Sequence, residues 1–374
     1  MSKKIIIDLR LLGKGGTSGI EEYTHALVAE LLRIDQKNSF LFFYNGFRKV
    51  SLPLDWLGVR EIYAGKIPNK FLDIASRFLN FPKVENFLAG DLVFSPHFNI
   101  IATDLPRIVT FHDLSFIHHP NFFSARQRFW HWLQNAEATA KNAGEIIAVS
   151  EFTKSDLVEL FHIKPEKIKV IYSGINKVFQ KLPSGNIEME RFRGKFKLHR
   201  PFILYLGTIE PRKNVISIIR AFNVLRQDNA YKDFELVIAG QPGWLYEETL
   251  AEAGHSPVKE YIKFLGRILP EERVYLYNLA RIFVYPSFFE GFGFPPLEAQ
   301  ACGVPVIASN RTSLPEVLGK SAILVNPWKL DQILSGMQTL INDGEKRKQL
   351  ILAGFENIEK FTLGRAATET ARLW

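Results

Sequence analysis

Apolar runs a few residues long recur along the chain and alternate with stretches that have helical periodicity. The runs are continuous instead of alternating with polar residues, which is typical of strands buried on both faces of a parallel sheet. They lie at residues 4–9, 40–44, 92–95, 108–111, 146–150 and 168–172 in the first half, and at 202–206, 236–239, 262–265, 282–285, 304–309 and 322–325 in the second. We therefore predict an α/β protein built from strand–helix units.

Two predicted helix N-caps and one long polar stretch add detail to this alternation of strands and helices. Ser124 and Ser150 are predicted N-caps, the first preceding an amphipathic stretch that runs to Asn142 and the second a helix over 154–161. Residues 173–200 are polar and basic and contain no strand-like run, with their loosest point at 183–185. We predict a domain boundary there. Open parallel sheets bind ligands at the carboxyl ends of their strands, so two such sheets predict a site in the cleft between them.

Composition narrows the class of protein. The 374 residues are 47% hydrophobic and 23% charged, which suits two globular domains and excludes a disordered or fibrous chain. Cys302 is the single cysteine, so a reducing compartment is expected. The first apolar run is too short for a signal peptide, and none approaches the roughly 18 residues that span a bilayer. We therefore expect a cytoplasmic protein, placed in part at the inner face of the membrane.

The charge is uneven. The chain has a formal net charge of +8, and residues 1–199 hold 27 of the 47 Lys and Arg but only 20 of the 39 Asp and Glu. This excess indicates an anionic partner or a merely solvated surface. We find no recognisable nucleic-acid module and expect no nucleic acid. Anionic lipid headgroups or a lipid-diphosphate acceptor fit better, and the aromatic stretch 129–133 either touches a membrane or packs in the core.

The segment from Glu290 to Glu298 carries the strongest chemical signal. It follows the strand-like run at 282–285 and combines glycines, which allow close backbone approach, with two prolines that begin a helix. Helix N-termini bind anions, and carboxylates accept hydrogen bonds from sugar hydroxyls. The segment therefore predicts a nucleotide-sugar site; the alternative is a turn with two surface acids.

A pair of cations supports this interpretation. Arg212 and Lys213 follow the run at 202–206 and precede the next helix, where they are well placed to bind a diphosphate. The alternative is a solvated basic pair. Because no two aspartates are two residues apart, the sequence lacks the D-x-D pattern that holds a divalent ion against a diphosphate. We expect the charge of the leaving group to be met by these cations and by helix dipoles.

Two weaker signals lie in the first half. Residues 14–23 form a glycine-rich loop that opens a helix but lacks the known dinucleotide and P-loop spacings, so it either faces a phosphate or substrate or is a plain connection. His112 follows the run at 108–111 and either donates to a substrate hydroxyl and supports proton movement, or is a structural histidine.

Together, Glu290-x7-Glu298, the EPRKN string at 210–214 and the distal ACGVPVIAS, LPEV and LVNP strings resemble a GT4-type retaining glycosyltransferase of the GT-B fold. The resemblance covers nearly the whole chain, and the EPRKN string resembles that of bacterial mannosyltransferases of polysaccharide assembly. It implies two Rossmann-like domains with parallel sheets facing across a cleft. Residues 1–183 would form the acceptor-side domain and residues 184–361 the donor-binding domain, with the helix 362–374 packing back on the first.

The resemblance also implies roles for individual residues. The catalytic set would be His112, Arg212, Lys213 and Glu290. The donor-binding set would be Gly19, Gly207, Thr208, Arg267, Gly291, Phe292, Gly293, Phe294 and Glu298. Within these sets, Glu290 would contact the hydroxyls of the donor sugar and Glu298 those of the ribose. Many relatives have Arg where Thr208 stands, which places more of the phosphate binding on Arg212 and Lys213.

The implied reaction is transfer of a hexose, with mannose favoured, from a nucleotide-diphosphate sugar to a glycan or lipid-linked hydroxyl. GDP-mannose is the favoured donor and a UDP-hexose the second. No metal cofactor is expected. Retention is expected through same-face attack, since no carboxylate is convincingly placed as a covalent nucleophile. A GT-B phosphorylase or epimerase, or a non-catalytic nucleotide-sugar-binding protein, remains an alternative.

Overall fold

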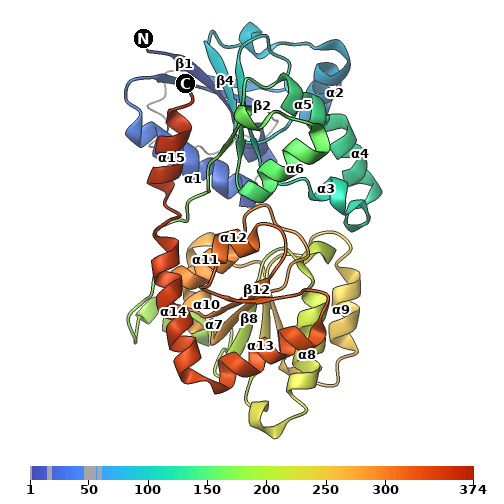
Figure 1. The fold of residues 1–374 in the computed structure, drawn as a ribbon, viewed down its shortest axis with the longest axis vertical. Helices are drawn as coiled ribbons and strands as arrows, with labels where there is room; N and C mark the ends of the chain where they lie inside the picture. The colour runs from blue at the N-terminus through green and yellow to red at the C-terminus, as the bar shows by residue number, and fades with distance from the viewer. Residues whose placement is uncertain (1, 15–18, 46–55, 57–60) are drawn as a thin grey trace. The chain divides into compact units, whose positions relative to one another are not determined.

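Each half of the chain folds around its own parallel sheet in the structure, a computed structural model that describes residues 2–14, 19–45, 56 and 61–374 (Figure 1). Contacts divide the chain into two units. The first comprises Met1–Gly174 and Phe361–Trp374, and the second comprises Ile175–Lys360. The α/β class predicted from the apolar runs is confirmed in both units.

The sheet of the first unit has the strand order β3-β2-β1-β4-β5-β6-β7, with all neighbouring strands parallel. Its strands are β1 Lys4–Asp8, β2 Ser39–Asn45, β3 Glu61–Gly65, β4 Leu92–Ser95, β5 Arg107–Phe111, β6 Glu145–Ala148 and β7 Ile168–Val170. Its α-helices are α1 Gly19–Ile34, α2 Asn69–Leu79, α3 Ser115–His118, α4 Ala125–Gln134, α5 Ala136–Asn142, α6 Glu151–Phe161 and α15 Leu363–Ala371. All six apolar runs of this half become strands.

The sheet of the second unit has the order β10-β9-β8-β11-β12-β13, again parallel throughout. Its strands are β8 Phe202–Leu206, β9 Glu235–Ala239, β10 Ile262–Gly266, β11 Ile282–Tyr285, β12 Val306–Ser309 and β13 Ile323–Val325. Its α-helices are α7 Ile187–Lys195, α8 Val215–Leu225, α9 Glu247–Gly254, α10 Arg273–Leu279, α11 Phe294–Ala301, α12 Leu314–Leu318, α13 Leu330–Asn342 and α14 Gly344–Ile358. Every residue of β8, β9, β11 and β12 is buried, as their continuous apolar runs predict.

Strand order creates a topological switch point in each unit. In the first sheet the order reverses beside β1 and β4, and in the second beside β8 and β11. At such a switch point the connections leave toward opposite faces of the sheet, which opens a crevice at the carboxyl ends of the two strands. Residues that directly follow β1, β4, β8 and β11 are therefore the ones that the topology brings to a ligand.

Local differences from the sequence analysis have identifiable causes. Strand β3 was not predicted because it is an edge strand whose first four residues are exposed or half-buried, so it lacks an apolar run. The stretch that begins after Ser124 is broken at Asn135, whose φ of 48° separates α4 from α5. Helix α6 begins at Glu151, with the Ser150 hydroxyl accepting from the backbone N–H of Thr153.

The division between the units falls after Gly174, earlier than the expected position 183. Two hydrogen bonds tie the intervening segment to the second unit. The N–H of Leu182 donates to Asn278 Oδ1 over 2.9 Å, and Asn278 Nδ2 donates to the carbonyl oxygen of Gln180 over 2.9 Å. The expected connection also contains a helix, α7, which contacts α10.

The C-terminal helix α15 lies against α1 of the first unit (Figure 1). Trp374 Nε1 donates to Asp35 Oδ2 over 2.9 Å, and the Trp374 ring packs near Phe94 with 5.6 Å between ring centroids. A Cβ at Gly174 would lie 2.2 Å from the backbone nitrogen of Leu363, so only glycine permits this approach. The end of the chain is thus an integral part of the first unit.

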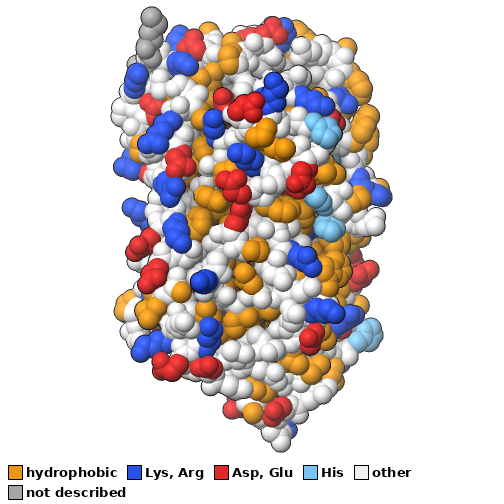
Figure 2. Space-filling model, viewed as in Figure 1, with side chains coloured by type: hydrophobic (Ala, Val, Ile, Leu, Met, Phe, Trp, Pro, Cys, Tyr) orange, Lys and Arg blue, Asp and Glu red, His pale blue; other side chains and the backbone are white. Residues whose placement is uncertain are grey.

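The surface charges and the helix lengths show how the protein could meet an anionic partner or a membrane. On the face shown in Figure 2, Lys and Arg side chains are interspersed with Asp and Glu, so that face does not present one sign of charge. Among the described residues, no helix combines the length and the apolar character needed to cross a bilayer.

Substituting Gly174→Ala is expected to destabilise the first unit by about 2 kcal/mol or more, because the new Cβ collides with backbone atoms that cannot move independently. Thermal unfolding measures the effect. Gly194→Ala is the matched control: nothing lies within 4 Å of its Cβ, and alanine favours the helix. Equal melting temperatures for the two variants would contradict the tight approach.

Candidate functional site

The switch point of the second unit brings the two strongest sequence signals together. The 3-10 helix Pro211–Lys213 follows β8, and the loop that contains Glu290 follows β11. Lys213 Nζ lies 2.6 Å from Glu290 Oε1, and Arg212 Nη1 lies 3.4 Å from Glu290 Oε2. Residues far apart in the sequence meet here because β8 and β11 are adjacent strands.

Each cation also has a second partner. Arg212 Nη2 donates to Glu210 Oε1 over 2.8 Å, and Lys213 Nζ donates to the Tyr285 hydroxyl oxygen over 2.7 Å. Arg212 and Lys213 are therefore not a solvated pair, since two carboxylates and a phenol hold them in place. An ammonium has three N–H donors, and among the described residues Glu290 and Tyr285 take two of those on Lys213.

Burial and charge shift the ionisation of this group. Burial raises the pKa of Glu290, but the nearby charges of Lys213 and Arg212 outweigh it and hold the pKa below its ordinary value. Burial and the like charge of Arg212 lower the pKa of Lys213, while Glu290 opposes both effects. Glu210 opposes them as well, so the group holds two cations and two carboxylates whose charges stabilise one another.

The loop around Glu290 is fixed by its own hydrogen bonds. The Ser287 hydroxyl donates to the carbonyl oxygen of Arg212 over 3.0 Å, and the Ser313 hydroxyl donates to that of Glu290 over 2.9 Å. Gly293 has φ of 101°, and a Cβ there would lie 2.5 Å from the Leu314 side chain. This glycine directly precedes α11. Because Pro295 and Pro296 carry no N–H, the first N–H of the helix that lacks a partner within it is that of Phe294.

Glu298 lies one turn into α11 and is buried. Its Oε2 accepts a 2.8 Å hydrogen bond from the hydroxyl of Tyr277 on α10. Burial, followed by the negative charge of Glu298, raises the pKa of Tyr277 well above its ordinary value. The phenol therefore stays protonated and orients one carboxylate oxygen of Glu298.

The remaining donor-binding candidates of the second unit are placed differently. Gly207 and Thr208 follow β8, and the carbonyl oxygen of Thr208 accepts from the Tyr205 hydroxyl over 2.9 Å. Gly291, Phe292 and Phe294 belong to the Glu290 loop and the start of α11, with Phe292 buried. Arg267 is exposed and follows β10, at the edge of the sheet, so the topology does not bring it to the switch point.

The candidates of the first unit are His112 and Gly19. His112 is buried, with Nε2 2.9 Å from the carbonyl oxygen of Pro96, and burial lowers its pKa. A neutral histidine that donates from Nε2 offers Nδ1 as an acceptor, so the expected donation to a hydroxyl is not the role that this geometry favours. Gly19 is exposed at the start of α1, and residues 15–18 of the glycine-rich loop lie outside the described residues.

Sequence reasoning missed a buried charged cluster at the switch point of the first unit. Asp8 Oδ2 accepts from Arg10 Nη2 over 2.8 Å, and Arg10 Nη1 lies 3.4 Å from Asp73 Oδ1. His97 Nε2, which has no hydrogen-bond partner in the described part of the chain, lies 3.9 Å from Asp8 Oδ2. Burial lowers the pKa of His97 to about 3 against the opposing charge of Asp8. The sequence did offer one signal for this cluster, namely position at the carboxyl end of a strand: Asp8 ends β1, and His97 soon follows β4.

Glu210, Tyr277 and Tyr285 were also missed as parts of the second site. Glu210 stood in the quoted EPRKN string without a role, whereas the two tyrosines lie in segments that look like ordinary core. Within the described residues, no group of three or more His, Cys, Asp or Glu side chains is arranged to hold a metal ion. Cys302 is buried, and burial raises its pKa to about 12.

Comparison with known families places both units in glycosyltransferase families. A model described as "Glycosyl transferases group 1" matches residues 186–356, and one described as "Glycosyltransferase Family 4" matches residues 17–178. The O-antigen chain mannosyltransferase B of Escherichia coli is 31% identical over 265 residues, which cover 70% of this chain and 68% of that protein. The serotype-specific mannosyltransferase WbdA of Escherichia coli is 29% identical over 72% of this chain but only 33% of its own length.

Solved structures with a similar fold include enzymes of sugar metabolism. Sucrose-phosphate synthase from Thermosynechococcus elongatus has a TM-score of 0.76 at 17% identity, covering 99% of this chain and 98% of that one. Anabaena HepE in complex with UDP-glucose has a TM-score of 0.75 at 17% identity, covering 99% of each chain. At these identities the likeness establishes the fold, GT-B, and not the substrate.

The free energy of unfolding is expected to fall as the pH drops from about 6.5 toward 4. The unfolded chain binds protons at its histidines in this range, whereas His97 remains neutral in the folded state until about pH 3. Each such histidine contributes a slope of about 1.4 kcal/mol per pH unit. His112 and His131 have pKa values lowered in the same direction.

Urea denaturation across this pH range tests the expectation, with His97→Gln as the informative variant. The variant removes one titrating group, so its stability should decline less steeply below pH 6.5 than that of the wild type. Parallel curves for the two proteins would show that His97 does not carry the effect.

Proposed function

Since this chain belongs to the group 1, family 4 glycosyltransferases, we propose that it transfers a hexose, with mannose favoured, from a nucleotide-diphosphate sugar to a hydroxyl of a glycan or lipid-linked acceptor. The observation that carries the proposal is the joining of Lys213, Arg212 and Glu290 at the switch point after β8 and β11. The relatives named as mannosyltransferases favour GDP-mannose as the donor. A UDP-hexose is the second candidate, because a structural neighbour was solved with UDP-glucose.

In this proposal the cations stabilise the departing diphosphate. Lys213 offers the N–H that its described protein partners do not use, and the start of α11 offers the backbone N–H of Phe294 next to Gly293. No metal ion is then required for the leaving group. Glu290 keeps acceptor capacity beyond its two cations, because a carboxylate has about four lone-pair positions, and it binds a hydroxyl of the donor sugar.

We propose that transfer retains the anomeric configuration through same-face attack. Two cations and a lowered pKa make Glu290 a weak nucleophile, so a covalent intermediate on it is disfavoured. The bond from the anomeric carbon to the phosphate oxygen breaks while the bond to the acceptor oxygen forms. The proton of the acceptor hydroxyl passes to the departing phosphate oxygen. His112 Nδ1 accepts a hydrogen bond from the sugar in this scheme, and Gly19 lies near the diphosphate.

The proposed acceptor also suggests where in the cell the enzyme acts. A lipid-linked acceptor would place the enzyme at the inner face of a membrane, as a peripheral protein that is otherwise cytoplasmic. The excess of basic residues in the first half of the chain supports attraction to anionic lipid.

Calorimetry with a panel of nucleotides and nucleotide sugars tests the donor, followed by transfer assays with and without EDTA. We expect the tightest binding for GDP-mannose, transfer that survives EDTA, and a product with retained anomeric configuration by NMR. Inversion at the anomeric carbon would overturn same-face attack. A requirement for inorganic phosphate, or turnover without acceptor, would indicate a phosphorylase or epimerase instead.

Lys213→Ala and Glu290→Gln are expected to separate diphosphate binding from sugar chemistry. Lys213→Ala should weaken GDP binding by about tenfold to a hundredfold, because a buried charge-assisted donor is lost. Glu290→Gln should leave GDP binding near the wild type but lower kcat by about a hundredfold or more. Titration calorimetry and steady-state kinetics measure the two effects. Lys348→Ala, an exposed change on α14, is the control, and wild-type behaviour of both site variants would refute the assignment.

Tyr277→Phe is expected to weaken discrimination for the ribose hydroxyls. Without the hydroxyl of Tyr277, Glu298 loses a partner that orients it toward a ribose. We expect wild type to bind GDP about tenfold more tightly than its 2′,3′-dideoxy analogue, and the variant to show a smaller ratio.

The control for this measurement is Tyr275→Phe on the same helix. A lowered melting temperature with an unchanged ratio would mean that Tyr277 only supports packing. Equal binding of both nucleotides by the wild type would instead remove the proposed role of Glu298 itself.

A further inference from the structure

Helix α2 of the first unit exposes most of its large apolar side chains. Leu72 is buried, together with the polar Asp73 and Ser76, whereas Phe71, Phe78 and Leu79 are 67%, 63% and 72% exposed. A surface helix normally turns its apolar side chains toward the core and its polar ones toward water. Leaving this apolar face in water is unfavourable, which points to a partner for it.

The exposed side chains form one continuous surface with those of α4, which we name the apolar platform. Its members are large apolar residues of α2, of its flanks and of α4, all exposed: Ile67, Phe71, Ile74, Phe78, Leu79, Phe81, Phe129 and Trp132. The rings of Phe78 and Trp132 are 6.4 Å apart between centroids, and those of Phe129 and Trp132 are 5.6 Å apart. Figure 1 shows α2 and α4 as neighbours on one flank of this unit.

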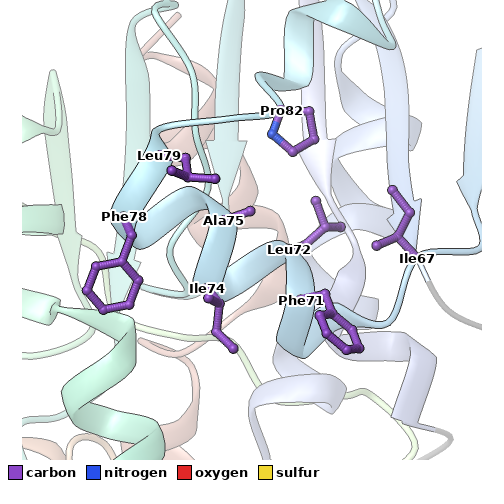
Figure 3. Close-up of a pocket in the computed structure, with 8 residues that line it drawn as sticks. All are labelled: Ile67, Phe71, Leu72, Ile74, Ala75, Phe78, Leu79 and Pro82. Atoms are coloured by element: carbon purple, nitrogen blue, oxygen red, sulfur yellow. The ribbon is translucent and has the colours of Figure 1, made fainter.

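A shallow groove runs along the platform. It has a volume of about 450 Å³ and is lined by eight apolar residues from Ile67 to Pro82. Figure 3 shows that these side chains project from α2 and from the segments that flank it, with Phe71, Ile74 and Phe78 directed away from the helix axis. Of the residues that the structure describes, no charged or polar side chain lines the groove, so they offer a polar ligand no hydrogen-bond partner there.

Buried polar contacts hold the two helices in this orientation. Asp73 accepts from Gln134 Nε2 over 2.9 Å and pairs with Arg10, so α2, α4 and the end of β1 are joined beneath the platform. Breaking such a buried pair would leave an uncompensated charge, which strongly disfavours rotation of α2 to hide its apolar face. The exposure is therefore built into the fold.

Charge identifies the occupant. The segments 66–83 and 124–134 contain six basic residues and one acidic residue, Asp73, which is buried. Lys66, Lys70, Arg126 and Arg128 are exposed around the platform, and the Arg77 guanidinium lies 6.0 Å from the centre of the Trp132 ring. Exposed aromatic side chains with a basic rim are typical of surfaces that insert into the headgroup region of anionic bilayers.

We propose that the apolar platform docks the protein on an anionic lipid bilayer. The inference rests on the proposed membrane contact of this glycosyltransferase and specifies the surface that makes it. The aromatic stretch 129–133 singled out in the sequence is the smaller part of this surface, since Leu133 is buried while Phe129 and Trp132 are exposed. Helix α2 supplies most of it.

Flotation with vesicles tests the proposal. The full-length protein is mixed with phosphatidylcholine vesicles, with or without phosphatidylglycerol, and the floated fraction is measured at low and high salt. We expect binding to the anionic vesicles alone, weakened by salt. Phe78→Ser combined with Leu79→Ser should lower the apparent affinity by at least about tenfold, because both side chains lose apolar burial in the bilayer.

A matched control uses Leu250→Ser with Leu352→Ser, which removes two exposed apolar side chains of the second unit. This variant should bind vesicles as the wild type does, and melting temperatures of all three proteins should agree because the changed residues are exposed. Lys70→Gln with Arg126→Gln should reduce both the binding and its dependence on salt.

Three outcomes would overturn the proposal. They are failure of the wild type to float with anionic vesicles, equal losses in the platform and control variants, and self-association that the platform variant abolishes without any vesicle binding. The last would identify a second copy of the chain as the partner. Transfer to a water-soluble acceptor is measured in parallel: if the wild type floats but transfers no sugar, the proposed function fails while the docking surface stands.

Discussion

The buried ion pair between Lys213 and Glu290 is the contact on which the second unit's site depends. It joins the segment after β8 to the loop after β11, and both charges lie where water cannot stabilise them, so each needs the other. Tyr285 and Arg212 complete the group and fix the loop that leads into α11. Everything proposed for the donor follows from this. The described partners of Lys213 leave one of its N–H donors, Glu290 keeps acceptor capacity, and the start of α11 is held beside them.

The first unit uses its switch point in another way. Asp8 at the end of β1 and Arg10 just after it form a buried pair that extends to Asp73 on α2 and through it to Gln134 on α4. These buried charges join α2 and α4 to the end of β1. In the second unit the corresponding charges instead join the segment after β8 to the loop after β11. The same arrangement of strands thus surrounds the proposed donor site in one unit and, in the other, holds two helices that expose the side chains of the apolar platform.

The fold was largely predictable from the sequence, because strands buried on both faces leave continuous apolar runs that need no tertiary information. Strand β3 escaped because an edge strand with an exposed face carries no such run. Position at the carboxyl end of a strand also identified Arg212, Lys213, Glu290 and His112 as candidates. Position alone could not reveal the hydroxyl of Tyr277 on Glu298 or the phenol of Tyr285 on Lys213, since these tyrosines are indistinguishable from core residues until the helices pack.

The sequence by itself determined the alternation of strands and helices and the types of side chain that follow each strand. It also determined the family that the EPRKN and ACGVPVIAS strings resemble. The tertiary structure decided which of these side chains meet. Adjacent strands bring residues far apart in the chain within 3 Å, and burial makes their charges depend on one another. The tertiary structure also decided that α2 exposes most of its apolar side chains, because Arg10 and Gln134 hold Asp73 in the interior. No local sequence pattern specifies that these three residues meet.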